Sequence, residues 1–392
     1  MKILAVHPFY PSGVYTVKRA PSRHEQDRHV VERGHSVCVI SCKTFGAPSF
    51  ERIGNVEIYR VPSLTLPVIE YPFPNLLMLF FWVKALSRQK DVDIIHVTDS
   101  HYLTTLVVPF LKWSLKKPLV LTIIGFPGVS WFYGNFLVDF SGKIYMLTIG
   151  RRILKYADKL VLSAKCLTKD AVRFGVPLNK IEVLHRGVNL EVFRPDRMRG
   201  ESLRSGLGIK KDDIVVLFAG RLVPVKGLKY FIEAAKILVR KNRKLKFIVA
   251  GDGVLRSKYE KEVRSCGSSI KFIGYRHDMS DVMNAADIFV LSSLSEGCPN
   301  AVLEAGACGK PVIATDVGAA RDLILNGGTG LVIEPRKVDE LCAALEKLVA
   351  NYDLEDMGQK ALQHVRKNFS WDKIVAQHER IYFEALRLSS AK

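Results

Sequence analysis

Two cations in the second half of this 392-residue chain have types and spacing suited to binding a phosphorylated ligand. Arg221 and Lys226 lie five residues apart in a predicted turn, between a buried strand that ends at Gly220 and a helix that begins after Gly227. At the carboxyl end of a central strand, two such cations can bind a diphosphate, Arg through its planar fork and Lys as a point charge. The same spacing is also compatible with two solvated cations on a loop.

Two glutamates flank a second predicted turn. Pro299 and Asn300 indicate a helix start, which places Glu296 in the preceding loop and Glu304 about one turn inside the helix. The free N–H groups near Asn300 and Ala301, together with the helix dipole, predict an anion site. The carboxylate of Glu304 can accept two hydrogen bonds, as a pair of ribose hydroxyls would donate. An ordinary position on a helix face is the alternative for Glu304.

The same two glutamates could instead be the acid/base pair of a glycosidase. Eight residues of helix span about 12 Å, whereas glycosidase carboxylates lie about 5–9.5 Å apart. A loop conformation for Glu296 would change this separation, so hydrolysis is disfavoured but stays open.

Other chemistry-bearing motifs are absent from the sequence. It contains neither G-x-G-x-x-G nor a P-loop, which argues against dehydrogenases and P-loop kinases. Asp91-Val92-Asp93 resembles a D-x-D metal site but directly precedes a predicted strand, so we interpret it as structural. No set of His, Cys and carboxylate residues has metal-ligand spacing. We therefore expect neither a metal nor a cofactor.

The elements that position these residues are short apolar strands alternating with helical patterns. Continuous rather than alternating apolar strands predict parallel sheets covered on both faces. A chain of this length exceeds one ordinary core, so the prediction is an α/β protein with two doubly wound, Rossmann-like domains that face each other across a cleft, where such folds bind ligands. The expected domains are 1–195 and 196–368, with a terminal helix in 369–392 that packs back on the first domain. The predicted strands are Ile3–Val6, Ser36–Ile40, Val56–Arg60, Ile94–Val97, Leu119–Ile123, Lys159–Leu162, Ile181–Leu184, Ile214–Ala219, Lys246–Ala250, Ile270–Ile273, Asp287–Leu291, Pro311–Ala314 and Gly330–Ile333.

Local signals predict where the first helix and the linker lie. A capping box begins at Ser22, and Gly34 ends the helix that follows. Residues 7–21 are then a long loop. The linker is expected near 192–196, continuing as a polar stretch to Asp213.

With these residues in place, the chain resembles the large retaining GT-B glycosyltransferases often called family 4 or group 1. The resemblance is strongest from Phe218 to Ile324 and weaker in the first half. It is carried by Ala219-Gly220-Arg221-Leu222 with Lys226-Gly227, Ala250-Gly251-Asp252-Gly253, Phe272-Ile273-Gly274-Tyr275, and the segment Ser295 to Ala305, in which Glu296 and Glu304 are the ends of an E-x7-E motif.

The resemblance implies a role for each of these residues. Arg221 and Lys226 would bind the donor diphosphate and stabilise the departing nucleotide, while Glu296 would hold donor-sugar hydroxyls; these three are the expected catalytic residues. The donor-binding residues so implied are Gly13, Gly251, Tyr275, Gly297, Asn300, Ala301 and Glu304.

The implied activity is the transfer of a hexose-type residue from a nucleoside-diphosphate sugar to a glycan or lipid-linked acceptor. Retention of configuration would come from front-face attack, with the donor phosphate taking the acceptor proton and no metal taking part. Two departures from the family pattern leave alternatives open. Val14 follows Gly13 where a second glycine is usual, and Ile124 stands where many members have a histidine. A non-catalytic sugar-nucleotide-binding or partner subunit, or a GT-B epimerase, would also fit.

The net charge of +19 favours anionic partners, and without a recognition motif nucleic acid is disfavoured. Apolar and cationic residues mix in 75–88 and 110–117, and aromatic residues crowd the predicted loop after Gly125. Such segments either pack on a sheet with snorkelling lysines or contact an anionic membrane. The longest apolar run, Leu76–Val83, is far shorter than the ~20 residues of a membrane span. A strand begins at once and leaves no room for a signal peptide, so we expect a cytoplasmic protein, with peripheral contact on the inner face of the membrane as an option.

Overall fold

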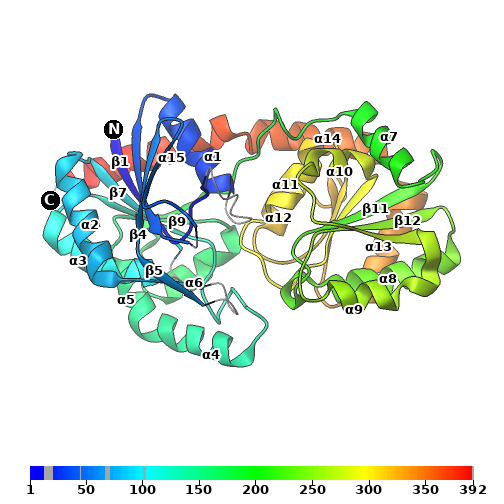
Figure 1. The fold of residues 1–392 in the computed structure, drawn as a ribbon, viewed down its shortest axis with the longest axis horizontal. Coiled ribbons are helices and arrows are strands. Elements are labelled where there is room, and N and C mark those ends of the chain that lie inside the picture. Colours follow the sequence, from blue (N-terminus) through cyan, green and yellow to red (C-terminus); the bar gives the residue numbers. More distant parts are fainter. Residues whose placement is uncertain (13–20, 45, 67–70, 100–102, 391–392) are drawn as a thin grey trace. The chain divides into compact units, whose positions relative to one another are not determined.

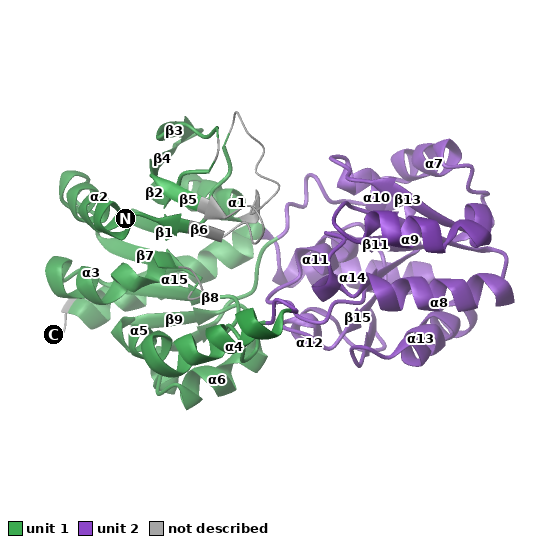
Figure 2. Ribbon diagram, turned by 60° about the horizontal axis from the view of Figure 1, so that its bottom comes forward, with its two compact units in different colours: residues 1–131, 135–187, 371–392 green, residues 132–134, 188–370 purple. Residues whose placement is uncertain are grey.

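The computed structural model describes residues 1–12, 21–44, 46–66, 71–99 and 103–390. The chain forms two compact units, coloured separately in Figure 2. Unit 1 contains Met1–Trp131, Asn135–Gly187 and Trp371–Lys392, and unit 2 contains Phe132–Gly134 and Val188–Ser370.

Unit 1 is built on an eight-stranded sheet in which every strand predicted for the first half is present. Its strands are β1 (Lys2–His7), β2 (Ser36–Cys42), β3 (Phe50–Ile53), β4 (Val56–Val61), β7 (Ile94–Thr98), β8 (Leu119–Ile123), β9 (Lys159–Leu162) and β10 (Ile181–Val183). Their order is β10-β9-β8-β7-β1-β2-β4-β3, and all neighbours are parallel except β3, which runs antiparallel to β4. The inner strands are almost completely buried, as a parallel sheet covered on both faces requires.

The sequence did not predict β3 or the antiparallel pair β5 (Ser63–Leu66) and β6 (Tyr71–Pro74). Strand β3 reads Phe-Glu-Arg-Ile and alternates between exposed and half-buried positions at the sheet edge. Short, charged edge strands of this kind lack the continuous apolar signal by which the central strands were found.

The helices of unit 1 include one that was expected to be loop. They are α1 (Pro21–Glu32), α2 (Leu76–Gln89), α3 (Val108–Leu115), α4 (Phe136–Tyr145), α5 (Arg151–Tyr156), α6 (Thr168–Arg173) and α15 (Trp371–Ser390), with a π-helical turn η2 (Met146–Gly150) joining α4 to α5. Helix α1 begins at Pro21 rather than after Ser22, since proline suits the first position of a helix. Phe136, placed by the sequence in an aromatic loop, is instead the first residue of α4.

Unit 2 is a second, fully parallel sheet with helices along both sides (Figure 1). Its strands, all predicted, are β11 (Ile214–Ala219), β12 (Leu245–Ala250), β13 (Ile270–Gly274), β14 (Ile288–Leu291), β15 (Val312–Thr315) and β16 (Gly330–Ile333), in the order β13-β12-β11-β14-β15-β16. Its helices are α7 (Arg197–Gly206), α8 (Leu228–Lys241), α9 (Arg256–Glu262), α10 (Met279–Ala285), α11 (Asn300–Ala307), α12 (Ala320–Leu323), α13 (Val338–Asn351) and α14 (Leu354–Asn368).

Helix α8 illustrates how the sequence forms these layers. Its buried residues include Leu228, Phe231, Ile232, Ala235 and Leu238, whose spacing of three and four residues gives one apolar face. That face packs in the core of unit 2 with the buried side chains of the central strands.

The expected linker differs from the structure in two ways. The division between the units falls between Gly187 and Val188, not at 195, because α10 binds the following segment: Asn284 Nδ2 donates to the carbonyl of Arg194 at 2.9 Å and Ser280 Oγ to that of Val192 at 2.7 Å. The polar stretch that follows is partly helical. Asp196 caps α7 by accepting from the N–H of Arg199 at 3.1 Å, so a low apolar content did not make this segment a loop.

The terminal helix α15 belongs to unit 1. The ring of Trp371 lies where a side chain at Gly187 would be, 2.5 Å from the position of its Cβ. Farther along, the hydroxyl of Tyr382 shares a 2.8 Å hydrogen bond with Nδ1 of His96, and Lys159 lies 2.7 Å from Glu384. In the part of the chain that the structure describes, no helix has the length and apolarity needed to cross a bilayer.

Replacing Tyr382 by phenylalanine should lower the free energy of unfolding by about 1–3 kcal/mol, because the buried Nδ1 of His96 loses its partner. Thermal unfolding of the full chain would measure the change. The matched control is Tyr156→Phe at an exposed position, which should leave the melting temperature nearly unchanged. Equal stability of the two variants would contradict the anchoring role of Tyr382.

Candidate functional site

The predicted site residues of unit 2 follow the carboxyl ends of adjacent strands. From β11 the chain proceeds outward through β12 and β13, and from β14 it proceeds in the opposite direction through β15 and β16. The strand order therefore reverses between β11 and β14, which is where doubly wound sheets bind ligands. The loop that carries Arg221 and Lys226 follows β11, and the loop that carries Glu296 follows β14.

Lys226 and Glu296 form an ion pair across this reversal. Lys226 Nζ lies 2.6 Å from Oε1 of Glu296, and Ser293 Oγ donates to the same oxygen at 2.6 Å. The glutamate side chain is buried and that of Lys226 is partly buried. Oε2 of Glu296 has no partner among the residues that the structure describes.

Close backbone contacts hold the two loops in register. Gly227 has a φ of +66°, and a Cβ there would lie 1.8 Å from the carbonyl oxygen of Ser292, so only glycine fits. The N–H of Leu294 also donates to the carbonyl of Val225 at 2.8 Å. Lys226 lies between these two contacts, so its position is set by main-chain packing.

Gly251, a predicted donor-binding residue, lies at the end of β12. A Cβ at this position would come 1.9 Å from the carbonyl oxygen of Gly220, and the Gly251 N–H donates to the carbonyl of Gly274 at 2.7 Å. The ends of β11, β12 and β13 are therefore held together through their backbones, and the close approach at Gly251 requires glycine.

Arg221 is at this edge but is not engaged. It follows β11, is exposed, and makes no side-chain hydrogen bond or ion pair with any described residue. The structure thus brings Lys226 to Glu296 while the guanidinium of Arg221 stays available for a bound anion.

The start of α11 combines the features expected of an anion site. Pro299 precedes the helix and supplies no side-chain cap, so N–H groups of the first turn, at Asn300 and Ala301, remain directed out of the helix end. Gly297 lies in the buried loop just before, where its carbonyl accepts from the Ala319 N–H at 2.8 Å. Oδ1 of Asn300 is buried and has no hydrogen-bond partner in the described structure. A ligand at this helix end would supply the missing partners.

Glu304 lies one turn farther along α11 with an unusual carboxyl group. Burial raises its pKa to about 7, because the charged form loses hydration. No hydrogen bond or ion pair to a described residue compensates that loss. A perturbed, uncompensated carboxylate beside an anion site is typical of a ligand-binding residue.

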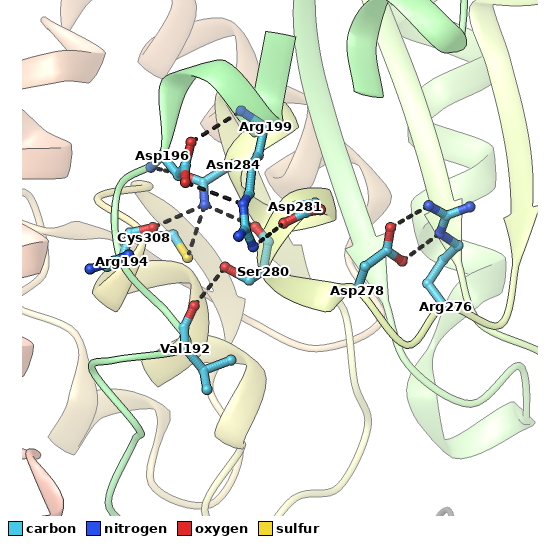
Figure 3. Close-up of polar contacts among 10 residues, drawn as sticks. All are labelled: Val192, Arg194, Asp196, Arg199, Arg276, Asp278, Ser280, Asp281, Asn284 and Cys308. Atoms are coloured by element: carbon cyan, nitrogen blue, oxygen red, sulfur yellow. Dashed lines mark hydrogen bonds and ion pairs between the residues drawn. The ribbon is translucent and has the colours of Figure 1, made fainter. Parts of the chain in front are cut away.

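Tyr275 follows β13 at the same edge, half-exposed, with its ring edge-on to that of His277 at 4.9 Å between centroids. The next residues line a cavity of about 400 Å³ between residues 277–281, which lead into and begin α10, and the segment 191–199. As Figure 3 shows, the polar groups around it mostly pair with one another, including Arg276 with Asp278 and Arg199 with Asp281. None of the predicted site residues lines this cavity.

Unit 1 contains a buried polar cluster to which the sequence had assigned no role. Nδ1 of His7 lies 2.9 Å from Oγ1 of Thr98 and its Nε2 3.3 Å from Asp27, while Arg23 pairs with Asp99. These groups and Ile124 surround a cavity of about 30 Å³ at the carboxyl ends of β1, β7 and β8.

Burial lowers the pKa of His7, His96 and His378. The lowering is large for His96 and brings the pKa of His378 to about 4, so all three are neutral near pH 7. The sequence signal was a histidine in each of two apolar strands. The partner of His96 on α15, Tyr382, is however far away in sequence.

Two further predicted features are Gly13 and the Asp91-Val92-Asp93 motif. Gly13 lies outside the residues that the structure describes. Asp91 and Asp93 act structurally: Oδ2 of Asp93 accepts from the Lys2 N–H at 2.8 Å, and Asp91 lies 3.7 Å from Lys2 Nζ. Within the described ranges, no three His, Cys, Asp or Glu residues gather closely enough to hold a metal ion.

Comparison with known proteins covers both units. Residues 200–364 match the family model described as glycosyl transferases group 1, and residues 24–192 match that of glycosyltransferase family 4. A UDP-Gal:alpha-D-GlcNAc-diphosphoundecaprenol alpha-1,3-galactosyltransferase of Escherichia coli is 32% identical over 355 residues, covering 88% of each chain.

Solved structures share the fold over nearly the whole chain. The sucrose-phosphate synthase of Thermosynechococcus elongatus has a TM-score of 0.80 at 21% identity and covers 100% of both chains. HepE of Anabaena, solved in complex with UDP, has a TM-score of 0.74 at 19% identity and covers 97% of this chain and 99% of that one. Both are similar to this chain in two Rossmann-like α/β units.

The raised pKa of Glu304 predicts a pH-dependent cost of folding. Because the folded state holds this proton more tightly than the unfolded state, stability should fall as the pH rises from about 4.5 to about 7. Glu304→Gln removes the effect, so its stability relative to the wild type should increase by up to about 3 kcal/mol between pH 5 and pH 8.

Urea unfolding at the two pH values would measure this difference. The control is Glu191→Gln at an exposed position, which should not change the difference between pH 5 and pH 8. If Glu304→Gln behaved like this control, the carboxyl group would not be desolvated as described.

Proposed function

This chain belongs to the glycosyltransferases of group 1 and family 4, and from that premise we propose that it transfers a hexose from a nucleoside-diphosphate sugar to an acceptor with retained anomeric configuration. The observation that carries the proposal is the Lys226–Glu296 pair at the strand reversal, with Oε2 of the glutamate unoccupied. A cation for the leaving phosphate and a free acceptor oxygen for sugar hydroxyls then lie side by side.

Departure of the nucleotide needs stabilisation of a growing negative charge. When the bond from the anomeric carbon to the diphosphate breaks, its electron pair stays on the phosphate oxygen. Lys226 keeps two N–H donors beyond the one given to Glu296, and Arg221 keeps its whole guanidinium. The free N–H groups at the start of α11 add fixed dipoles, and preorganised donors of this kind lower the barrier most. We propose that these groups act in place of a metal.

Retention would follow from attack on the face that the nucleotide leaves. The acceptor hydroxyl forms its bond to the anomeric carbon on that face, and its proton passes to the departing phosphate oxygen. The reaction needs no protein base, which is consistent with Ile124 at the edge of unit 1.

Glu304 and Gly251 complete the proposed donor site. The unpaired carboxylate of Glu304 would accept from the two ribose hydroxyls, which would lower its raised pKa toward the usual range. Gly251 and Tyr275 would line the nucleoside, because Gly251 follows β12, the neighbour of β11, and Tyr275 follows β13, the next strand out.

We propose a lipid-linked acceptor, used at the cytoplasmic face of a membrane, over a free glycan. Support comes from the Escherichia coli relative, whose name specifies UDP-Gal as donor and a diphosphoundecaprenol-linked sugar as acceptor.

Lys226→Ala and Glu296→Gln should each lower donor turnover by about a hundredfold or more, since each removes a preorganised contact to the transition state. Release of the nucleoside diphosphate from a panel of sugar donors would measure turnover. Lys229→Ala and Glu233→Gln, an exposed pair on α8, are the matched controls and should keep full activity. Full activity in both site variants would defeat this assignment, whereas donor binding without turnover on any acceptor would favour a non-catalytic subunit.

A thermal-shift series should identify the donor base. UDP-sugars are expected to raise the melting temperature more than GDP- or ADP-sugars at equal concentration, because a selective ligand stabilises the folded state by mass action. Glu304→Ala should reduce the shift. A larger increase in melting temperature with GDP- or ADP-sugars would contradict a UDP-sugar donor.

A further inference from the structure

Helices α2, α3, α5, η2 and α4 form one continuous layer of unit 1. Each contacts the next, and Figure 1 shows them following one another along one side of the unit. Their outer faces carry large apolar side chains that lie in solvent, among them Leu77, Phe81 and Trp113, with exposed fractions of 72%, 62% and 76%. Single exposed apolar residues are common, but a contiguous run of them marks an interaction surface.

Helix α4 is the extreme case, because none of its ten residues is buried. It is nevertheless a well-formed helix: Oδ1 of Asn135 accepts from the N–H groups of Leu137 and Val138 at 3.0 and 3.3 Å. One side lies against the loop before it, where Gly142 is so close to Pro127 that a Cβ would be 2.8 Å from the proline side chain. The opposite side is largely exposed to solvent, with Phe136, Phe140 and Ile144 79%, 54% and 48% exposed.

That free side is an apolar stripe. Phe136, Phe140 and Ile144 follow at intervals of four residues and lie on one face, continued by Leu147 in η2. Phe136 is 79% exposed, and its ring stacks on that of Phe140 with 6.0 Å between centroids. A helix with no fully buried residue that presents two stacked phenylalanines to solvent leaves this apolar face for a partner outside unit 1.

The charges of the layer select that partner. Helices α2, α3, α4 and α5 contain two, one, one and three Lys or Arg residues, and with η2 they contain a single carboxylate, Asp139. An apolar stripe edged by cations matches an anionic lipid surface, where the stripe enters the acyl boundary and the cations meet the headgroups. A second copy fits poorly, because a two-fold dimer would bring this cationic face against itself.

We propose that the exposed face of α4, with the outer faces of α2 and α3 in the same helix layer, docks the protein on an anionic membrane. The exposed apolar and cationic residues support this surface without reference to the proposed function. The link to the proposed function, on which it rests, is that a lipid-linked acceptor would be bound at the same membrane. The loop 124–131 connects this surface to the cavity of unit 1: Ile124 lines the cavity, and Pro127 supports α4.

Cosedimentation of the full chain with vesicles tests the proposal. Vesicles of phosphatidylcholine with 30 mol% phosphatidylglycerol should bind the wild type, whereas pure phosphatidylcholine vesicles should bind it much less, and 0.5 M salt should weaken binding. Phe136→Gln with Phe140→Gln should reduce the partition coefficient by about tenfold or more, since two large apolar side chains no longer insert. The matched control is Met198→Gln with Val254→Gln, at two equally exposed positions of unit 2.

Three results would overturn the proposal. They are the absence of wild-type binding to the anionic vesicles, equal binding by the α4 variant, and an equal loss in the control. A wild-type dimer in sedimentation velocity that becomes a monomer in the α4 variant would instead assign the stripe to self-association. Donor turnover in solution should be unchanged in the α4 variant, so vesicle binding without sugar transfer would defeat the proposed function and leave the docking surface standing.

Discussion

The ion pair between Lys226 and Glu296 depends on the reversal of strand order in unit 2. Only at that point do two loops from non-consecutive strands leave the sheet edge together, one after β11 and the other after β14. The charges could be held there by side chains alone, but the backbone contact between Gly227 and Ser292 fixes the loops before any side chain takes part. A buried carboxylate requires such a fixed cation, because charge without a partner is costly in the interior. The geometry of the proposed donor site and the stability of the fold therefore depend on the same contact.

Unit 1 also has buried polar groups at the carboxyl ends of its strands, but few of them are charged. There the buried groups include three neutral histidines, so the cluster is held largely by hydrogen bonds; its carboxylates are Asp99, paired with Arg23, and Asp27, 3.3 Å from His7. Neutral histidines tolerate a polar but uncharged ligand next to them. The contrast with the cationic edge of unit 2 is consistent with one unit that stabilises a leaving anion and another that orients a hydroxyl.

The sequence predicted the central strands, the helix start at Asn300 and the loops that carry Lys226 and Glu296, because each has a local signal in a few neighbouring residues. It could not predict that Arg221 would stay unpaired while Lys226 engaged a glutamate 70 positions away. The cluster around His96 was missed for the same reason, since its partner Tyr382 is 286 residues distant. The sequence placed Phe136, the first residue of α4, in a loop, because a predicted helix is expected to bury a face and this helix has no fully buried residue. Local periodicity encodes the elements, whereas packing across distant segments decides which polar groups meet.

The return of α15 to unit 1 has a consequence for how the gene can be divided. The N–H of Val188 donates to the carbonyl of Phe369 at 2.9 Å, and Val188 forms a parallel β-bridge with Ser370, so the first and last residues of the main segment of unit 2 are adjacent. The chain returns to unit 1 at Trp371, whose ring packs on Gly187, the last residue of unit 1 before that segment. Residues 188–370 are therefore inserted between two parts of unit 1. A domain whose ends lie next to each other can be inserted in this way with little disturbance of the host domain. Recombination that exchanges this module intact needs two crossovers, and a stop codon after residue 370 would truncate unit 1 while leaving the main segment of unit 2 complete.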